Sequence, residues 1–432
     1  MDQFIAHSEQ LLDFIHKSPS CFHVVENMAQ ALLGAGFQEL VLTDVWTLRA
    51  PGKYFVRQNG SALFAFTMGG EELPETGFRF ITAHSDSPTF RIKPNPEMLA
   101  AGLLRLNTEV YGGAILMSWL DRPLSVAGRV VLKTDDPLNP KQVLADLERP
   151  VGVIPSLAIH LNRQVNAGVE LNPQTDMPLF VATVDQTFVK EGALLRAVAA
   201  KLGVAADDIV DCDLFLYDVQ KGCVLGLDNN LLLSPKLDDL AMAYAGLQAL
   251  LNAADAGKNN MLCVFDNEEV GSGTKQGAAA PTLRHILERI CDKLALSTED
   301  FQRMVYRSFM ISADQAHALH PNAVGKHDPV LHPVLNGGPV VKYNASQKYM
   351  TDADGASVFI SLCRQAGVPC QFFANRSDMA GGSTLGNILT RQLDIRGVDV
   401  GNPMLGMHSS RETGGVLDQW YATQVFTTFF SV

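Results

Sequence analysis

Long apolar runs, blocks of basic residues and closely spaced cysteines are all missing from this sequence. No stretch of it approaches the roughly 18 apolar residues that a bilayer-spanning helix needs, so we expect no membrane partner. Lys and Arg total 34 against 46 Asp and Glu, the formal net charge is −12, and no basic cluster stands out. A nucleic-acid partner is therefore not expected either.

The cysteines and the first residues of the chain bear on its compartment. Seven cysteines form an odd set without a Cys-x-x-Cys pair, and some lie in apolar runs such as Leu262-Cys263-Val264. This pattern is typical of reduced, mostly buried thiols and not of a disulfide framework. Residues 1–5 lack the basic stretch and apolar run of a secretory signal. We expect a cytoplasmic protein.

Hydrophobic periodicity divides the chain into two kinds of region. Between about 91 and 235, short β-rich runs are separated by Pro, Gly and Asn. From 236 onward helices and strands alternate, which is typical of a layered α/β domain. We therefore predict an α/β domain formed by 1–92 and 236–432, with a β-rich domain inserted at 93–235.

Individual elements follow from the same patterns. Asn59-Gly60 between two apolar runs predicts a hairpin. The expected helices are at 3–15, 21–33, 191–202, 240–254, 283–294, 356–366 and 416–429, and the expected strands at 54–56, 63–67, 78–83, 261–265, 308–313 and 371–374.

Polar residues that directly follow a strand are the first site candidates, because ligands in open α/β sheets bind beyond the carboxyl ends of the strands. His84-Ser85-Asp86 follows the strand at 78–83. A histidine can bind a metal through one ring nitrogen while a nearby carboxylate orients the ring. Taken alone, the motif is weak evidence and favours a loop histidine beside a capping aspartate.

A second strand end is strongly acidic. Asp266-Asn267-Glu268-Glu269 follows the strand at 261–265, where neighbouring carboxylates would repel one another unless a cation compensates them. A solvated acidic turn is the alternative. The segment leads into Val270-Gly271-Ser272-Gly273, however, and not into further charge. This context favours one metal ligand and one general base.

Asp314 stands at the third strand end, after 308–313. His317 and His320 follow it at a spacing that would place both rings on one helical face. Pro321 instead predicts a turn, and a supporting role for both histidines is as plausible as metal ligation. We leave His317 and His320 out of the predicted ligand set.

Two more segments complete the predicted site. Asp238 and Asp239 open a predicted helix, where either one alone is also compatible with a plain helix cap, and His408 lies in a Gly-rich loop. With the strand-end residues they make a set of His, Asp, Glu, Asp and His. Such nitrogen and oxygen donors bind a pair of zinc-like ions, with a carboxylate left to bridge them. The residues alone do not choose between Asp238 and Asp239 as the bridge.

These segments, in this order, resemble the aspartyl aminopeptidase family of two-metal peptidases, and the resemblance spans almost the whole chain. The resemblance implies a bacterial member with a three-layer α/β/α metallopeptidase domain and an inserted dimerisation or lid domain. It also implies an aminopeptidase that removes acidic first residues from peptides. The residues that carry the resemblance are 83–88, 236–240, 266–272, 312–321 and 407–409.

The resemblance also implies individual roles. Asp238 is the implied bridging ligand, and Glu268 is the implied general base. Asp86 is implied to orient His84. The other implied ligands are His84 and Asp314 for one ion, and Glu269 and His408 for the other. One departure is Asp239, where the eukaryotic relatives tend to have Asn.

Partners and specificity follow from the resemblance as well. Family members form dodecamers built from dimers, with the insert implied to pair subunits. His160 resembles a histidine that the insert of one subunit contributes to the active site of its neighbour. An acidic substrate residue needs a cation in its pocket, for which Lys342 is the first candidate, Arg376 and Lys348 are others, and a solvated lysine is the plain alternative. The two ions are expected to be Zn²⁺, with Co²⁺ or Mn²⁺ as alternatives.

Two other functions are compatible with the same residues. A carboxypeptidase or a deacylase of N-acylated amino acids can use the same two-metal centre, because the metals do not choose the end of the substrate. A catalytically silent assembly protein with structural metals is the second alternative, although it has no need of Glu268 beside a complete ligand set.

Overall fold

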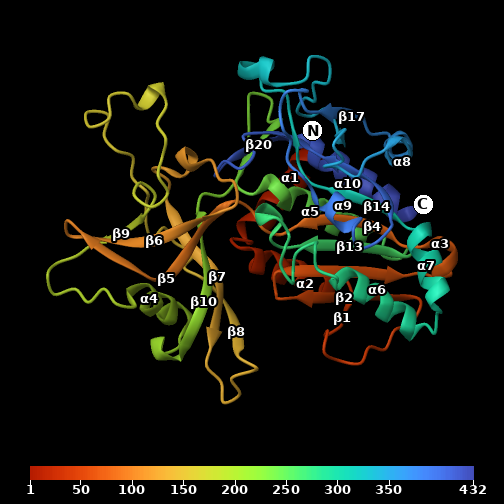
Figure 1. Cartoon of the computed structure of the whole chain (residues 1–432), viewed down its shortest axis with the longest axis horizontal. Coiled ribbons are helices and arrows are strands. Elements are labelled where there is room, and N and C mark those ends of the chain that lie inside the picture. Colours follow the sequence, from red (N-terminus) through yellow and green to blue (C-terminus); the bar gives the residue numbers. More distant parts are fainter.

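The computed structural model describes residues 1–432 and contains three β-sheets (Figure 1). The nine-stranded sheet consists of β1 (Gln38–Glu39), β2 (Gly52–Gln58), β3 (Ala62–Met68), β4 (Arg79–His84), β13 (Asn260–Phe265), β14 (Phe309–Ala313), β16 (Val340–Tyr343), β17 (Gln371–Ala374) and β18 (Arg396–Gly401). Their order across the sheet is β1-β2-β3-β13-β4-β14-β18-β16-β17. The strands β13, β4 and β14, at the middle of the sheet, run parallel to one another.

Both faces of this sheet are apolar, as expected for strands covered on both sides. On β4, Ile81 and Ala83 enter one core and Phe80 enters the other. One face is covered by α1 (Asp2–His16), α2 (Cys21–Gly34), α5 (Leu237–Asn252), α8 (Ala353–Ala366) and α10 (Val416–Ser431). The other is covered by α3 (Leu73–Thr76), α6 (Thr282–Lys293), α7 (Thr298–Arg307) and α9 (Leu385–Leu389). The predicted three-layer α/β/α fold is confirmed.

Local predictions hold where the sequence signal is strong and fail where it is weak. Asn59 and Gly60 both have positive φ between the antiparallel strands β2 and β3, as a type I′ hairpin requires. Helix α7 and the strands β16 and β18 were not predicted. α7 starts at a reciprocal capping box between Ser297 and Asp300, in which Asp takes the place of the usual Glu or Gln.

A six-stranded sheet lies beside this layered unit, on the left in Figure 1. It consists of β5 (Thr89–Ala100), β6 (Leu103–Tyr111), β7 (Leu124–Leu132), β8 (Lys141–Asp146), β9 (Leu179–Thr183) and β10 (Ile209–Asp218), with α4 (Ala193–Leu202) packed against it. Side chains from these elements form a hydrophobic core of their own. The β-rich insert expected from the sequence is therefore present as a separately packed sheet.

A small five-stranded sheet joins distant parts of the chain and was not expected. It consists of β11 (Cys223–Leu225), β12 (Leu231–Ser234), β15 (Ala316–His317), β19 (Pro403–Leu405) and β20 (Glu412–Gly415). β12 pairs with β20 just before α5 begins, which brings the start of α5 next to the loop between β19 and β20.

No helix is both long and apolar enough to cross a membrane. All seven cysteines are free thiols.

Candidate metal centre

Three neighbouring parallel strands deliver the first candidate residues to one edge of the nine-stranded sheet. His84 is the last residue of β4 and lies level with Phe265 at the end of β13. Glu268 and Glu269 follow β13, and Asp314 follows β14. The strand ends therefore place these side chains together because the strands are parallel and in register.

The two remaining ligand candidates arrive from other elements. Asp238 and Asp239 lie in the first turn of α5, where their backbone is not helical and the peptide bond between them is cis. His408 lies between β19 and β20 with a positive φ of 67°. All five predicted ligands occur in the groups of clustered donor atoms near this edge.

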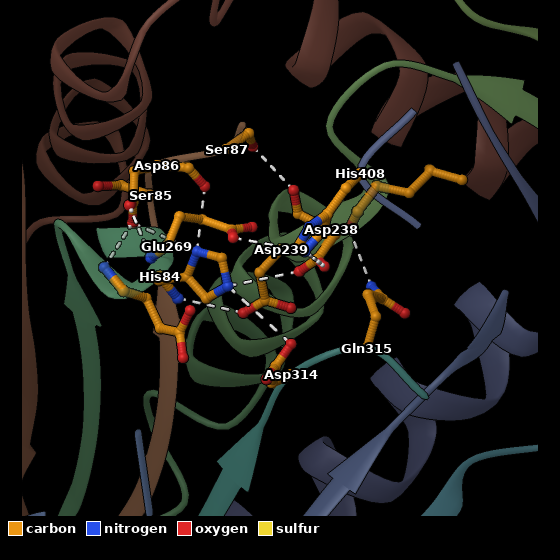
Figure 2. Close-up of polar contacts among 12 residues, drawn as sticks. His84, Ser85, Asp86, Ser87, Asp238, Asp239, Glu269, Asp314, Gln315 and His408 are labelled. Carbon is orange, nitrogen blue, oxygen red and sulfur yellow. Dashed lines mark hydrogen bonds and ion pairs between the residues drawn. The ribbon is translucent and has the colours of Figure 1, made fainter. Parts of the chain in front are cut away.

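Carboxylates surround the His84 ring (Figure 2). Its Nε2 is 3.4 Å from Asp238 Oδ1 and 4.0 Å from Asp314 Oδ1. Its Nδ1 is 3.0 Å from the backbone carbonyl of Asp86 and 3.4 Å from Asp86 Oδ1. Since a carbonyl only accepts, Nδ1 carries a hydrogen, and Nε2 is the ring atom that faces Asp238 and Asp314 and is available to a metal.

His408 stands on the other side of Asp238. Its Nε2 is 3.6 Å from Asp238 Oδ2 and 3.4 Å from Glu269 Oε2. Its Nδ1 is 3.2 Å from the carbonyl of Gly113, so this ring too turns its Nε2 toward carboxylates. The two oxygens of Asp238 thus face two different histidines, whereas Asp239 clusters only with the His84 side.

The electrostatics of the cluster are those of a buried acidic site that a cation would stabilise. Burial raises the pKa of Glu269 and of Asp314, and the charge of Asp238 adds to both shifts while Lys342 opposes the shift at Asp314. Burial alone would also raise the pKa of Asp238, but His408 and His84 on either side lower it. At His84 burial disfavours the charged ring, yet Asp239, Asp238 and Asp86 together raise its pKa.

Three buried oxygens make the need for a cation explicit. Asp238 Oδ1, Asp239 Oδ1 and Glu269 Oε1 are buried and have no hydrogen-bond partner. A buried carboxylate oxygen without a partner costs free energy unless a positive charge lies next to it. The nitrogen and oxygen donors present here fit a divalent metal of the zinc type.

Two further carboxylates hold candidate ligands through their backbone. Asp239 Oδ2 accepts the His84 N–H at 3.1 Å. Glu412 accepts the N–H of Asp238 at 3.0 Å and that of His408 at 2.7 Å. Sequence reasoning missed Glu412, whose only signal was its position four residues after His408.

Asp86 plays the same part beneath the Glu268–Glu269 turn. Its Oδ1 accepts the Glu268 N–H at 3.1 Å and its Oδ2 accepts the Glu269 N–H at 3.2 Å. The carboxylate therefore holds the turn, and the closest contact to the His84 ring comes from the Asp86 backbone carbonyl. The sequence analysis suggested that the Asp86 carboxylate orients His84. It did not suggest that this carboxylate holds the Glu268–Glu269 turn.

Glu268 differs from Glu269 in its surroundings. Its carboxylate lies near His84 and Glu269 but makes no hydrogen bond to the protein, and it lines a cavity of about 460 Å³ in front of the cluster. Burial raises the pKa of Glu268 to about 8. The positive charge of His84 opposes this shift, and the neighbouring carboxylates add to it. Glu269 lines the same cavity, but of the two glutamates only Glu269 also clusters with Asp238 and His408.

The three candidate cations are placed differently. Lys342 is buried, lines the same cavity, and is the only Lys or Arg that does so. Its Nζ lies 3.6 Å from Asp314 Oδ2 and donates to the Asp314 and Gln315 carbonyls. Lys348 donates to the Gly381 carbonyl, and Arg376 pairs with Asp378, both outside the cavity lining.

The remaining histidines lie apart from the clustered donor atoms. His317 lines the cavity beside Phe373, and His320 accepts the Asn322 N–H. Neither belongs to a group of clustered metal donors. His160 is exposed in the loop between β8 and β9 of the six-stranded sheet, and the fold of a single chain does not bring it to the cluster.

Comparison with known proteins connects this geometry to an activity. Residues 14–430 match the family model of the aminopeptidase I zinc metalloproteases (M18). The chain belongs to the M18 family of aminopeptidases. This M18 aminopeptidase is therefore a metal-dependent peptide hydrolase of a zinc family, which confirms the predicted enzyme class. Membership of this family favours an aminopeptidase over the alternatives of a carboxypeptidase, a deacylase or a catalytically silent assembly protein.

Relatives of this M18 aminopeptidase match it over nearly their full length. The probable M18 family aminopeptidase 2 of Clostridium acetobutylicum is 48% identical over 426 residues, or 98% of both chains. A chain of the cryo-EM structure of the Ape4 and Nbr1 complex is similar with a TM-score of 0.96 and 34% identity, covering 99% of this chain and 86% of that chain. The S. cerevisiae mApe1 dodecamer structure has a TM-score of 0.86 and 29% identity, covering 100% and 97%.

Proposed function

We propose that this M18 aminopeptidase holds two divalent ions per subunit and removes an N-terminal, preferably acidic, residue from peptides. The observation that carries the proposal is the position of Asp238, whose two oxygens lie 3.4 Å and 3.6 Å from the Nε2 atoms of His84 and His408. Asp238 is thus the proposed bridge. His84 and Asp314 would hold one ion, and Glu269 and His408 the other. Zn²⁺ is the proposed metal, and Co²⁺ or Mn²⁺ suit the same donors.

Bound ions of this kind activate a water molecule and polarise the scissile carbonyl. Glu268 is the proposed general base, because its carboxylate lines the cavity beside the cluster and makes no hydrogen bond to the protein. It would take a proton from the attacking water and return it to the departing amine. Asp86 would keep Glu268 in place through its backbone N–H and would orient His84 through a carbonyl.

Lys342 is the proposed source of acidic preference. It supplies the only ammonium or guanidinium group in the cavity lining, close to Asp314. Its Nζ donates to two backbone carbonyls and lies 3.6 Å from Asp314 Oδ2, and its positive charge would attract a substrate carboxylate. Arg376 and Lys348 are less suitable because other partners hold them outside the cavity.

A panel of dipeptides tests reaction, substrate end and acidic preference together. Free dipeptides that begin with Asp or Glu are expected to have higher kcat/KM than those that begin with Ala or Leu, and N-acetylated versions are expected to resist cleavage. In Lys342→Met the acidic-over-neutral ratio should fall more than about tenfold, the equivalent of one charge-assisted hydrogen bond of about 1.5–3 kcal/mol. Damage at Asp314 would lower the kcat/KM of acidic and neutral dipeptides alike, so it cancels in their ratio.

Lys348→Met is the matched control for this experiment and should leave the ratio unchanged. A lower ratio in Lys348→Met but not in Lys342→Met would move the specificity pocket. Efficient cleavage of the N-acetylated dipeptides would reject the aminopeptidase direction in favour of a deacylase or carboxypeptidase.

We further propose that residues 1–92 and 236–432 are the catalytic unit and that 93–235 pairs subunits in a dodecamer built from dimers. The insert has a core of its own, and the loop around His160 exposes Leu157, Ile159 and Leu161 at 59%, 52% and 75%. The similar mApe1 of yeast forms a dodecamer. The free thiols support the cytoplasm as the compartment.

Mixed oligomers test whether His160 acts in a neighbouring active site. His160→Ala and Glu268→Gln are each expected to lose most turnover when expressed alone. When both chains are co-expressed with different tags and purified together, some sites combine an intact Glu268 with an intact His160 from the partner. Turnover should therefore reappear in the mixture. A mixture no more active than the two separate variants would show that His160 does not act across subunits.

A further inference from the structure

One segment of the six-stranded sheet reaches into the metal centre. Residues 111–118 leave the end of β6 and pass directly beside the Glu268–Glu269 turn and the His408 loop. We call residues 111–118 the bridging segment. Its contacts are to residues that carry or hold the proposed ligands, although no residue of the segment is itself a ligand candidate.

Tyr111, at the start of the bridging segment, bonds to the carboxylate that holds the base. Its hydroxyl donates to Asp86 Oδ2 at 2.7 Å and accepts from Asn267 Nδ2 at 2.8 Å. The Tyr111 ring packs edge-on against Phe215 of β10, with ring centroids 5.7 Å apart. The hydroxyl therefore fixes the rotation of a carboxylate whose two oxygens accept the Glu268 and Glu269 N–H groups.

The next residues approach the other side of the centre. A Cβ atom on Gly112, whose φ is +72°, would lie 3.2 Å from the Glu269 Cβ, and one on Gly113 would lie 3.2 Å from His408 Nδ1. The Gly113 carbonyl accepts from that Nδ1, and the Ile115 N–H donates to the His408 carbonyl. Two glycines thus allow the backbone to come close enough to set the tautomer and position of His408.

Hydroxyl contacts complete the attachment farther along. The Ser410 N–H donates to Ser118 Oγ at 2.8 Å, and the Ser410 hydroxyl donates to the Ser118 carbonyl at 2.5 Å. The bridging segment is therefore fastened to the His408 loop at Ile115 and Ser118, beyond its contact with the imidazole. A shift of the six-stranded sheet would move Asp86 and His408 together.

We propose that the bridging segment is a positioning element of the metal centre, with Tyr111 acting through Asp86 on Glu268 and Glu269 and the Gly113 carbonyl acting on His408. This inference rests on the proposed function, since it assigns the metal ligands as above. The proposed consequence is that metal affinity and catalytic rate depend on residues outside the α/β/α layers. Tyr111 and Gly113 touch neither substrate nor metal in this role.

Tyr111→Phe tests the proposal because it removes only the hydroxyl and keeps the ring against Phe215. We expect zinc affinity, measured by competition with a chromogenic chelator, and kcat each to fall about 10- to 100-fold, as is usual when a group that holds a metal ligand is lost. KM should change little. The matched control is Tyr217→Phe on β10, which likewise loses a hydroxyl bond to a carboxylate, Asp146 at 2.6 Å.

A double-mutant cycle separates positioning from general destabilisation. In an Asp86→Asn background, Tyr111→Phe should cause little additional loss of zinc affinity, because both changes break the same connection. Thermal unfolding of all four proteins shows whether each is folded at the assay temperature. Equal zinc affinity and kcat in Tyr111→Phe and Tyr217→Phe would overturn the proposal.

The same measurements keep this inference distinct from the proposed function. If the wild-type enzyme bound one ion per subunit, or did not prefer acidic peptides, the proposed function would be wrong in that respect. The ratio of zinc affinities between wild type and Tyr111→Phe would still decide the role of the bridging segment. Gly113→Ala provides a second route, and it too should weaken zinc binding because its Cβ presses on His408 Nδ1.

Discussion

Glu268→Gln is expected to lower kcat by about 100- to 10,000-fold, the usual contribution of a general acid or base, while the enzyme keeps its metal. Glutamine has the shape of glutamate but cannot take the proton of the attacking water. The metal should remain because Glu268 is not among the proposed ligands and its carboxylate makes no hydrogen bond to the protein. Steady-state turnover and metal content by elemental analysis, on the same preparation, measure both effects.

Glu299→Gln serves as the matched control for this change. Glu299 is exposed in the first turn of α7, remote from the cavity, and its replacement should alter neither quantity. If Glu268→Gln kept near-normal kcat, the base would have to be sought elsewhere. If instead it lost metal, Glu268 would be a ligand and its distinction from Glu269 would fail.

Asp238→Asn is expected to lose both ions and to lower turnover more than about 100-fold, because the reaction then lacks the several kcal/mol that the metals supply. The substitution keeps the size of the side chain but removes the charge that faces both histidines. His408→Ala, by contrast, leaves His84, Asp314 and Asp238 in place and should retain one ion per subunit. Metal-to-protein ratios after gel filtration distinguish the two outcomes.

Asp418→Asn controls for the loss of a buried carboxylate as such. Asp418 is fully buried and accepts the N–H groups of Asn336 and Gly338, away from the cluster. This variant should lose stability but keep two ions per subunit at temperatures where it is folded. An Asp238→Asn enzyme with the same metal ratio as His408→Ala would argue against a bridging role.

The candidate site was predictable where it depends on the ends of parallel strands. His84, Glu269 and Asp314 each follow an apolar run that is long enough to be recognised as a strand, and parallel neighbours place such ends together. The layered fold was predictable for a related reason, since strands buried on both faces and amphipathic helices leave strong periodic patterns. Short strands with few apolar residues, such as β18, leave almost none.

The residues that hold the ligands were not predictable in this way. Glu412 binds the backbone of Asp238, and Gly113 meets His408, across separations of 174 and 295 residues. These contacts depend on how the three sheets pack, and a single acidic or glycine residue in a loop carries no periodic signal. The choice between Asp238 and Asp239 was open for the same reason, and only the different directions of their carboxylates separate them.

The pairing of β12 with β20 has a consequence for how the enzyme first becomes active. During synthesis the chain emerges from its amino end, so His84, Asp238 and Asp314 leave the ribosome well before His408 and Glu412. The strand partner that brings the His408 loop beside α5 begins at Glu412, far along the chain from His84 and Asp238. A nascent chain that has not reached Glu412 therefore lacks part of the proposed metal centre. The proposed active site can form only after these late residues have been synthesised.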